Sequence, residues 1–166
     1  MGERAAAPLD LQGLLEALSR HRVEYLVIGG VAVQVHGHRR TTKDLDLMPA
    51  PGAQNAARLA AALDELEARA VAASGEAPSP VSPEQLALAA VVPPLLTTHG
   101  ELHLLPEPKG AGEWAAMRER ALVVDLDGID VAIVGLDDLI RMKLAAGRPA
   151  DLDDVAVLTA LERGDS

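Results

Sequence analysis

The stretch formed by residues 25–49 constrains the fold of this chain more than any other part of the sequence. It opens with an apolar run, Tyr25–Ile28, which has the length and composition of a buried strand and which ends at Gly29-Gly30. Residues 31–36 follow and are predicted to form a short helix. Two glycines between a buried strand and a helix allow backbone N–H groups to approach a phosphate closely, at the positive end of the helix dipole.

The same stretch closes with the alternating sequence Asp44-Leu45-Asp46-Leu47. Alternation is the period of a strand, so the two aspartates are predicted to share one face and the two leucines the other. Two carboxylates on one face repel each other unless a cation lies between them, and Mg²⁺ suits such a site when substrate phosphates complete its ligands. The combination with the diglycine predicts metal-assisted phosphoryl chemistry. Taken alone, the aspartates are more typical of a solvated strand end than of a metal site, and the glycines are also typical of a plain turn.

The rest of the chain alternates between helical and strand-like patterns. Periodicity predicts helices over residues 11–18 (with Asp10 as N-cap), 54–69, 113–120, 136–146 and 151–163, and a short helix opened by Ser82 to Gln85. Strands are predicted at residues 45–48, 95–99, 101–105, 121–125 and 129–133, with a proline-rich loop at 74–83. We expect one α/β domain over residues 1–166, with a mixed sheet that has antiparallel parts and is covered by helices, and with helices 136–163 packing on it.

Composition limits the possible partners. Apolar residues make up 49% of the chain with only one Trp, one Tyr and no Phe, so the core is predicted to be aliphatic. The formal charge of −10 disfavours binding to bulk DNA, although Arg39, Arg40 and Lys43 form a local basic patch that suits a specific nucleic-acid end. The sequence has no cysteine, no apolar run long enough for a membrane and no signal-peptide core in its first ten residues. We therefore expect a cytoplasmic protein.

The motif of Ile28, Gly29-Gly30 and Asp44 to Leu47 resembles the signature of the polymerase-beta-type nucleotidyltransferase superfamily. The chain is most similar to the small bacterial and archaeal branch that includes minimal antitoxins and abortive-infection-type toxins, over about residues 11–161. This resemblance implies a nucleotidyltransferase-like fold and a nucleoside triphosphate substrate. It also implies an Mg²⁺ (or Mn²⁺) ion held by Asp44 and Asp46.

The position of the third acid in that family departs from the pattern. Its members carry a stretch similar to Gly-x-Leu-Asp-Leu-Leu-Pro, and here the matching stretch, residues 100–106, has His103 at the place of the acid. An imidazole is a poorer Mg²⁺ ligand than a carboxylate. Glu101 lies two residues earlier and is predicted to share a strand face with His103. Three interpretations remain beside that of a structural histidine: His103 is a general base, Glu101 substitutes for the acid, or turnover is impaired.

Three further residues are predicted to bind the nucleotide. Lys143 continues the apolar stripe of its helix, a position typical of a lysine at the border of a buried face, and the resemblance implies that it faces the nucleotide. The resemblance also implies that Arg40 contacts the triphosphate, with Thr42 assisting through its hydroxyl. Asp151 is predicted to cap the last helix and to pair with Arg148.

The sequence thus predicts transfer of a nucleoside monophosphate from a nucleoside triphosphate to a hydroxyl on a protein, an RNA end or a small molecule. The alternative is a nucleotide- or partner-binding module with impaired catalysis, such as the antitoxin half of a toxin–antitoxin pair. The histidine at position 103 is the feature that supports this alternative.

Overall fold

The structure is a computed structural model that describes residues 7–72, 74–88 and 91–164. In chain order its elements are α1 (Leu11–Arg20), β1 (Tyr25–Ile28), α2 (Gly29–Val35), β2 (Asp44–Pro49), α3 (Ala53–Glu65), β3 (Arg69–Ala70), α4 (Pro83–Leu88), β4 (Leu95–Thr97), β5 (Gly100–Leu104), α5 (Trp114–Glu119), β6 (Leu122–Leu126), β7 (Ile129–Ile133), α6 (Leu136–Ala146) and α7 (Pro149–Glu162). The start of α1 matches the predicted N-cap, since the Asp10 side chain accepts a hydrogen bond from the Gly13 N–H.

The strands of the described residues form one seven-stranded sheet in the order β3-β4-β5-β2-β1-β7-β6. β2 lies at its centre, antiparallel to β1 and parallel to β5, while β1 is parallel to β7. The outer pairs β3–β4, β4–β5 and β6–β7 are antiparallel. The prediction of an α/β fold with a mixed sheet is therefore confirmed. The parallel pairing of β2 with β5 brings together two segments that are far apart in the sequence.

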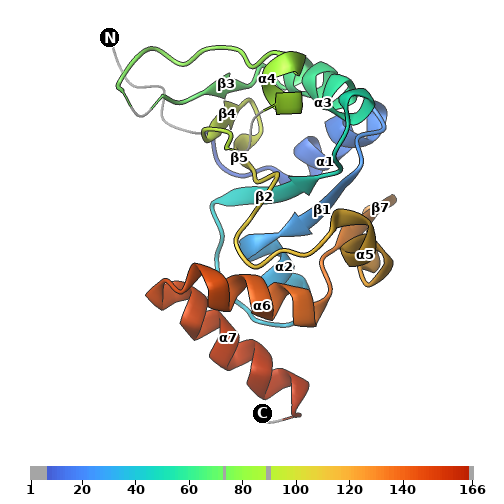
Figure 1. Cartoon of the computed structure of the whole chain (residues 1–166), viewed down its shortest axis with the longest axis vertical. Coiled ribbons are helices and arrows are strands. Elements are labelled where there is room, and N and C mark those ends of the chain that lie inside the picture. The colour runs from blue at the N-terminus through green and yellow to red at the C-terminus, as the bar shows by residue number, and fades with distance from the viewer. Residues whose placement is uncertain (1–6, 73, 89–90, 165–166) are drawn as a thin grey trace.

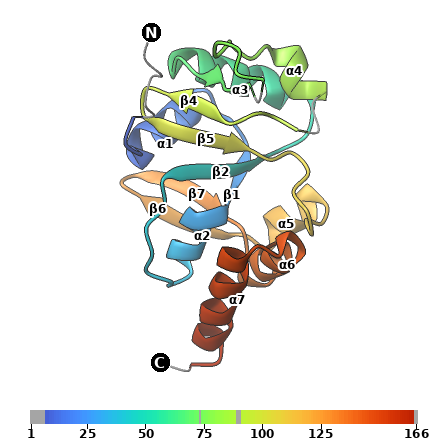
Figure 2. The ribbon, with the colours of Figure 1, turned by 90° about the vertical axis from the view of Figure 1, so that its left-hand side faces the viewer.

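The helices divide between the two ends of the molecule. Figure 1 shows α3 and α4 at one end and the α6–α7 pair at the other, with β1 and β2 between them. α2 packs against β1, β2 and α6, so it connects the central strands to the C-terminal helix pair. Figure 2, turned by 90°, shows α7 running away from the sheet beyond α6. None of the helices within the described residues has the length and apolarity that a membrane crossing requires.

The core is aliphatic, as the composition predicts. Its largest fully buried side chains come from the strands and from the helices and turns that pack on them: Leu14, Leu15, Leu18, Leu26, Leu45, Leu47, Leu66, Leu95, Leu102, Met117, Ile133 and Leu139. Each such leucine or isoleucine stabilises the fold by about 1.5–3 kcal/mol relative to an exposed position. The leucines of β2 therefore face inward, and this fixes the opposite face of the strand as the one that carries Asp44 and Asp46.

A buried ion-pair cluster fixes the start of α6. Asp138 is 2% exposed, and it accepts hydrogen bonds from Arg120, after α5, at 2.9 Å through both Nε and Nη2. Arg141, one turn further along α6, also pairs with it. These hydrogen bonds, from Arg120 first, hold the pKa of Asp138 below its usual range. Because α6 carries Lys143, the cluster helps to set where that lysine lies.

Two predicted helix boundaries need correction. The helix predicted to begin at residue 31 begins at Gly29, so the two glycines form the first residues of α2. The larger error concerns α3. The helix predicted over residues 54–69 ends at Glu65, and Arg69 and Ala70 form β3, which pairs with β4. The reason is that Glu67 adopts a left-handed φ of 51° and the Ala68 N–H donates to the Leu63 carbonyl, a typical helix-ending geometry. Glycine usually occupies such a position, so a glutamate there gives no sequence signal.

Candidate active site

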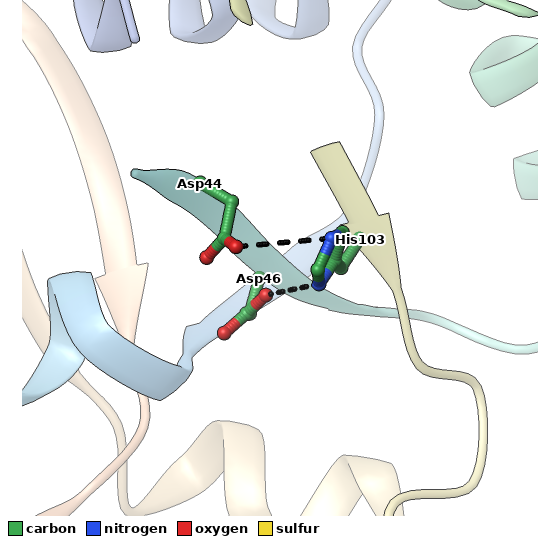
Figure 3. A group of neighbouring side chains, drawn as sticks. All are labelled: Asp44, Asp46 and His103. Atoms are coloured by element: carbon green, nitrogen blue, oxygen red, sulfur yellow. Dashed lines mark ion pairs between the residues drawn. The ribbon is translucent and has the colours of Figure 1, made fainter. Parts of the chain in front are cut away.

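Four polar side chains meet on one face of the central strands. In the β2–β5 ladder Asp44 is the register partner of Glu101, and Asp46 is the partner of His103. Figure 3 shows both aspartates directed to the same side of β2, with the His103 ring beside them. The structure therefore brings together the four residues that the sequence suggests as catalytic, because alternation on two adjacent strands selects one face of each.

His103 lies among three carboxylates. Its Nε2 is 2.7 Å from Glu101 Oε1 and 3.8 Å from Asp44 Oδ2, and its Nδ1 is 3.2 Å from Asp46 Oδ1. The contact with Asp46, followed by the one with Glu101, outweighs partial burial and raises the pKa of His103 to about 9. The imidazole is thus a cation at neutral pH in the absence of metal. The pKa of Asp44 is raised, mainly by burial and then by the charge of Asp46.

The diglycine bend lies directly against these carboxylates. Gly29 has a φ of +66°, and a Cβ added to it would lie 1.9 Å from Asp46 Oδ2. A Cβ on Gly30 would lie 2.6 Å from Thr42 Oγ1. The two positions therefore require glycine, the first for its backbone conformation as well as for space. The Thr42 hydroxyl in turn donates to the Asp44 carbonyl at 3.1 Å, which ties the loop to the start of β2.

The predicted phosphate-binding cations are held by acids of the last helix. Lys143 is buried, and its Nζ lies 3.1 Å from Asp151 Oδ1 and 3.0 Å from Asp154 Oδ2. Arg40 Nε lies 2.9 Å from Asp154 Oδ1, and its Nη2 donates to Oδ2 at 3.1 Å. Asp154, 2% exposed, thus links α6, α7 and the loop before β2.

Asp151 stands one turn earlier and combines two contacts. It accepts from the Arg148 backbone N–H at 3.2 Å and from Arg148 Nε at 2.7 Å, as the sequence suggests, although α7 begins at Pro149 rather than at the aspartate. Burial alone raises the pKa of Asp151, but the hydrogen bonds from Arg148 and Lys143 outweigh it and hold the pKa below its usual range. Asp151 is therefore a charged acceptor at neutral pH.

Asp154 is the site residue that the sequence reasoning missed. A signal was available, because Asp151 and Asp154 are three residues apart on a helix and therefore lie on the same face. An inward-facing lysine on the preceding helix is a suitable partner for such a pair.

Two cavities adjoin the site. One has a volume of about 510 Å³, and its lining includes Gly30, Arg40, Thr42, Asp44, Asp46, His103, Lys143 and Asp154. The other has a volume of about 410 Å³ and a more apolar lining that includes Ile28, Gly29, Leu104, Leu139 and Met142. Asp46, Lys143 and Arg148 line both. Volumes of this size are usual for small-molecule sites. Glu101 lines neither cavity and reaches the site through its hydrogen bond to His103.

The donor set fits a divalent cation. Asp44, Asp46 and His103 each offer a ligand atom, and these atoms all lie within 4.8 Å of one another. Asp46 Oδ1 is buried and accepts no hydrogen bond from the described residues, since the His103 ring nitrogen 3.2 Å away is not aligned for one. Without metal, the His103 imidazolium offsets the charge of this oxygen, and a bound divalent cation would take over that role.

Comparison with known proteins places the fold. No protein-family model and no curated protein matches the sequence. Among solved structures, the chain matches ANT(2″)-Ia in complex with adenylyl-2″-tobramycin at 16% identity and a TM-score of 0.58, covering 92% of this chain and 86% of that one. It also matches a candidate nucleotidyltransferase from Thermotoga maritima at 13% identity and a TM-score of 0.54, covering 92% and 91%. A third match is an antigenic nucleotidyltransferase-like protein from Paracoccidioides brasiliensis, at 17% identity and a TM-score of 0.55, covering 93% and 79%. The chain therefore has a nucleotidyltransferase fold, as its first motif indicates.

Proposed function

We propose that this protein transfers a nucleoside monophosphate from a nucleoside triphosphate to a hydroxyl group of an acceptor. The observation that carries the proposal is the joint position of Asp44, Asp46 and the Gly29 bend where the two cavities adjoin. Asp44 and Asp46 share a strand face, and the Gly29 bend packs against Asp46 without room for a side chain. The nucleotidyltransferase fold supports this assignment.

Asp44 and Asp46 are the residues that would hold an Mg²⁺ or Mn²⁺ ion. Carboxylate oxygens are the preferred ligands of both ions, and the buried, unsatisfied Asp46 Oδ1 supports this role. A bound ion would act as a Lewis acid on phosphate oxygens and would offset the charge that develops on them.

The triphosphate is assigned to the charged cavity. Gly30, Arg40 and Lys143 line it, and Thr42 lies beside them. The contacts of Lys143 with two aspartates use two of its three N–H groups, so it retains a donor for a phosphate oxygen. The Gly29 and Gly30 backbone can approach phosphate closely because no side chain intervenes. Arg40 and Lys143 then neutralise negative charge as pyrophosphate leaves.

Glu101 and His103 complete the proposed catalytic group. We assign to Glu101 the proton that the acceptor hydroxyl loses, because Asp44 and Asp46 are the carboxylates that would hold the ion. Its Oε1 accepts from His103 at 2.7 Å, and its second oxygen serves the acceptor. His103 connects Glu101 to Asp46 and fixes the position of both.

A second candidate function is a nucleotide- or partner-binding module without turnover, such as the antitoxin half of a toxin–antitoxin pair. One observation favours it: the site neutralises itself. His103 is a cation between the carboxylates, and Asp154 pairs with both Arg40 and Lys143. A ligand must compete with these internal pairs.

The test measures pyrophosphate. The protein is incubated with each labelled nucleoside triphosphate, Mg²⁺ or Mn²⁺, and in turn an RNA with a free 3′ end, a candidate partner protein, or tobramycin, the small molecule adenylylated in the ANT(2″)-Ia complex. Release of pyrophosphate together with label on one acceptor supports transfer and identifies the acceptor class. Binding of nucleotide without any product under these conditions favours the module.

A further inference from the structure

The cation site contains an imidazole where two carboxylates alone would suit Mg²⁺. Ligand atoms from Asp44, Asp46 and His103 lie within 4.8 Å of one another. Atoms that share one ion at bond lengths of about 2.1 Å lie about 3 to 4.2 Å apart, so a small movement of these side chains brings the group to the spacing of a single ion. The three donors come from two hydrogen-bonded strands, and the ladder fixes their relative position.

The hydrogen bonding of His103 resembles that of a metal ligand. A histidine that binds a metal through one ring nitrogen usually donates its other N–H to a carboxylate, which fixes the tautomer and the ring orientation. Here Nε2 lies 2.7 Å from Glu101 Oε1, so Nδ1 is the nitrogen that faces Asp46. The Asp46 oxygen that it faces is buried and accepts no hydrogen bond from the described part of the chain. Nδ1 and this oxygen lie 3.2 Å apart, and an ion between them would bind both.

The chemistry of the donors determines which ion. Carboxylates suit Mg²⁺, Ca²⁺ and Mn²⁺, whereas imidazole suits transition metals. Mg²⁺ demands a near-ideal octahedron of oxygen ligands and retains several waters. Mn²⁺ accepts the same oxygens and, as a transition metal, tolerates the nitrogen.

We infer that His103 is a metal ligand that Glu101 positions, and that the Asp44–Asp46–His103 site selects Mn²⁺ over Mg²⁺. This inference deepens the proposed function and rests on it for the place of the ion, but it concerns binding and is measured without turnover.

The experiment titrates the protein with Mn²⁺ and follows the electron paramagnetic resonance signal of the free ion, with and without competing Mg²⁺. Pulsed measurements on the bound ion then report whether a nitrogen nucleus is coordinated. The native protein is expected to bind Mn²⁺ more tightly than Mg²⁺ and to show nitrogen coupling. The H103D variant should show no nitrogen coupling, and its preference for Mn²⁺ over Mg²⁺ should be smaller. E101Q should weaken Mn²⁺ binding by about tenfold, the usual effect of losing a carboxylate that supports a metal-bound histidine.

The control is His21→Ala, which removes a partly buried histidine outside the site, 3.6 Å from Glu65, and should change neither signal. H103Q serves as a second variant if H103D fails to fold by circular dichroism. Equal competition by Mg²⁺, absence of nitrogen coupling with Mn²⁺ bound, or absence of binding would each overturn the inference. Nitrogen-coupled Mn²⁺ without pyrophosphate release would retain the inference and reject the proposed function. Pyrophosphate release together with equal binding of Mn²⁺ and Mg²⁺ would support the proposed function and reject this inference.

Discussion

Asp46 on β2 and His103 on β5 are register partners in neighbouring parallel strands, and their side chains meet at 3.2 Å between Oδ1 and Nδ1. In the nucleotidyltransferase motif that this chain resembles, the position of His103 belongs to an acid. The imidazolium therefore occupies the position of a third carboxylate and reduces the negative charge that a metal-free site would otherwise carry.

Replacing His103 with Asp tests how far the positive charge of the imidazolium stabilises the metal-free protein. Without metal, we expect H103D to unfold at a lower temperature than the native protein, because an added carboxylate faces Asp44, Asp46 and Glu101. Added Mg²⁺ should raise the unfolding temperature of the variant more than that of the native protein, since the ion replaces the lost cation. Scanning calorimetry with and without Mg²⁺ measures both. A variant that is more stable than the native protein without metal would contradict this account.

Gly29→Ala should disrupt the site from the backbone side. The new Cβ would lie 1.9 Å from Asp46 Oδ2, and the residue would keep a φ of +66°, so we expect a loss of more than about 1 kcal/mol in the free energy of unfolding together with loss of nucleotide binding.

Gly147→Ala is the matched control for that variant. Gly147 has the same φ of +66°, but a Cβ added to it would lie at an ordinary 3.6 Å from the Leu144 carbonyl oxygen. It should show the conformational cost alone, about 1 kcal/mol by urea unfolding, and should retain nucleotide binding. Equal effects of the two substitutions on binding would mean that the bend does not take part in the site.

Asp154→Asn should weaken both the fold and the nucleotide site. The carboxylate pairs with Arg40 and with the buried Lys143, and removing one partner of a buried ion pair typically costs about 3 kcal/mol. Asp153, the exposed neighbour on α7, provides a control with the same charge change. Urea unfolding and calorimetric titration with a triphosphate measure the two effects. Equal effects of Asp154→Asn and Asp153→Asn on stability and on triphosphate binding would mean that Asp154 does not position Arg40 and Lys143.

The single tyrosine provides a test of packing at high pH. Burial raises the pKa of Tyr25 to about 12, above the value near 10 of an unfolded chain. The unfolded state therefore loses this proton first, so the contribution of Tyr25 to stability is intact below pH 10 and is lost as pH rises towards 12. It amounts to at most about 3 kcal/mol. Ultraviolet absorbance of tyrosinate, followed against pH in native and in urea-unfolded protein, checks that the unfolded chain loses the proton at lower pH. Coincident titration curves of the two states would contradict this prediction.

Local patterns predict most of this fold. The helix predicted at residues 136–146 is found as α6 with the same limits, and the strand before the diglycine is found as β1. Both have complete local signals: an apolar stripe that ends at Gly147, and an apolar run that ends at Gly29. The Asp127-Gly128 pair likewise turns β6 into β7, with φ values of 52° and 89°.

Long-range pairings could not be predicted in the same way. The sequence suggests that Glu101 and His103 share a strand face, but their register with Asp44 and Asp46 depends on β5 choosing β2 as its parallel neighbour. No local pattern encodes that choice. The same holds for Lys143: its stripe predicts a position at the border of a buried face, but its partners Asp151 and Asp154 follow only from how α7 packs on α6.

Nucleotidyl transfer by this site requires both Asp44 and Asp46 to act on a metal-bound triphosphate, and pyrophosphate release tests that requirement most directly. It should be measured for the native protein, for Asp44→Asn, for Asp46→Asn and for Asp64→Asn, which removes an exposed acid on α3 with the same change in net charge. We expect release by the native protein and by Asp64→Asn, and none above background by either site variant. Undiminished release by the site variants would contradict the account.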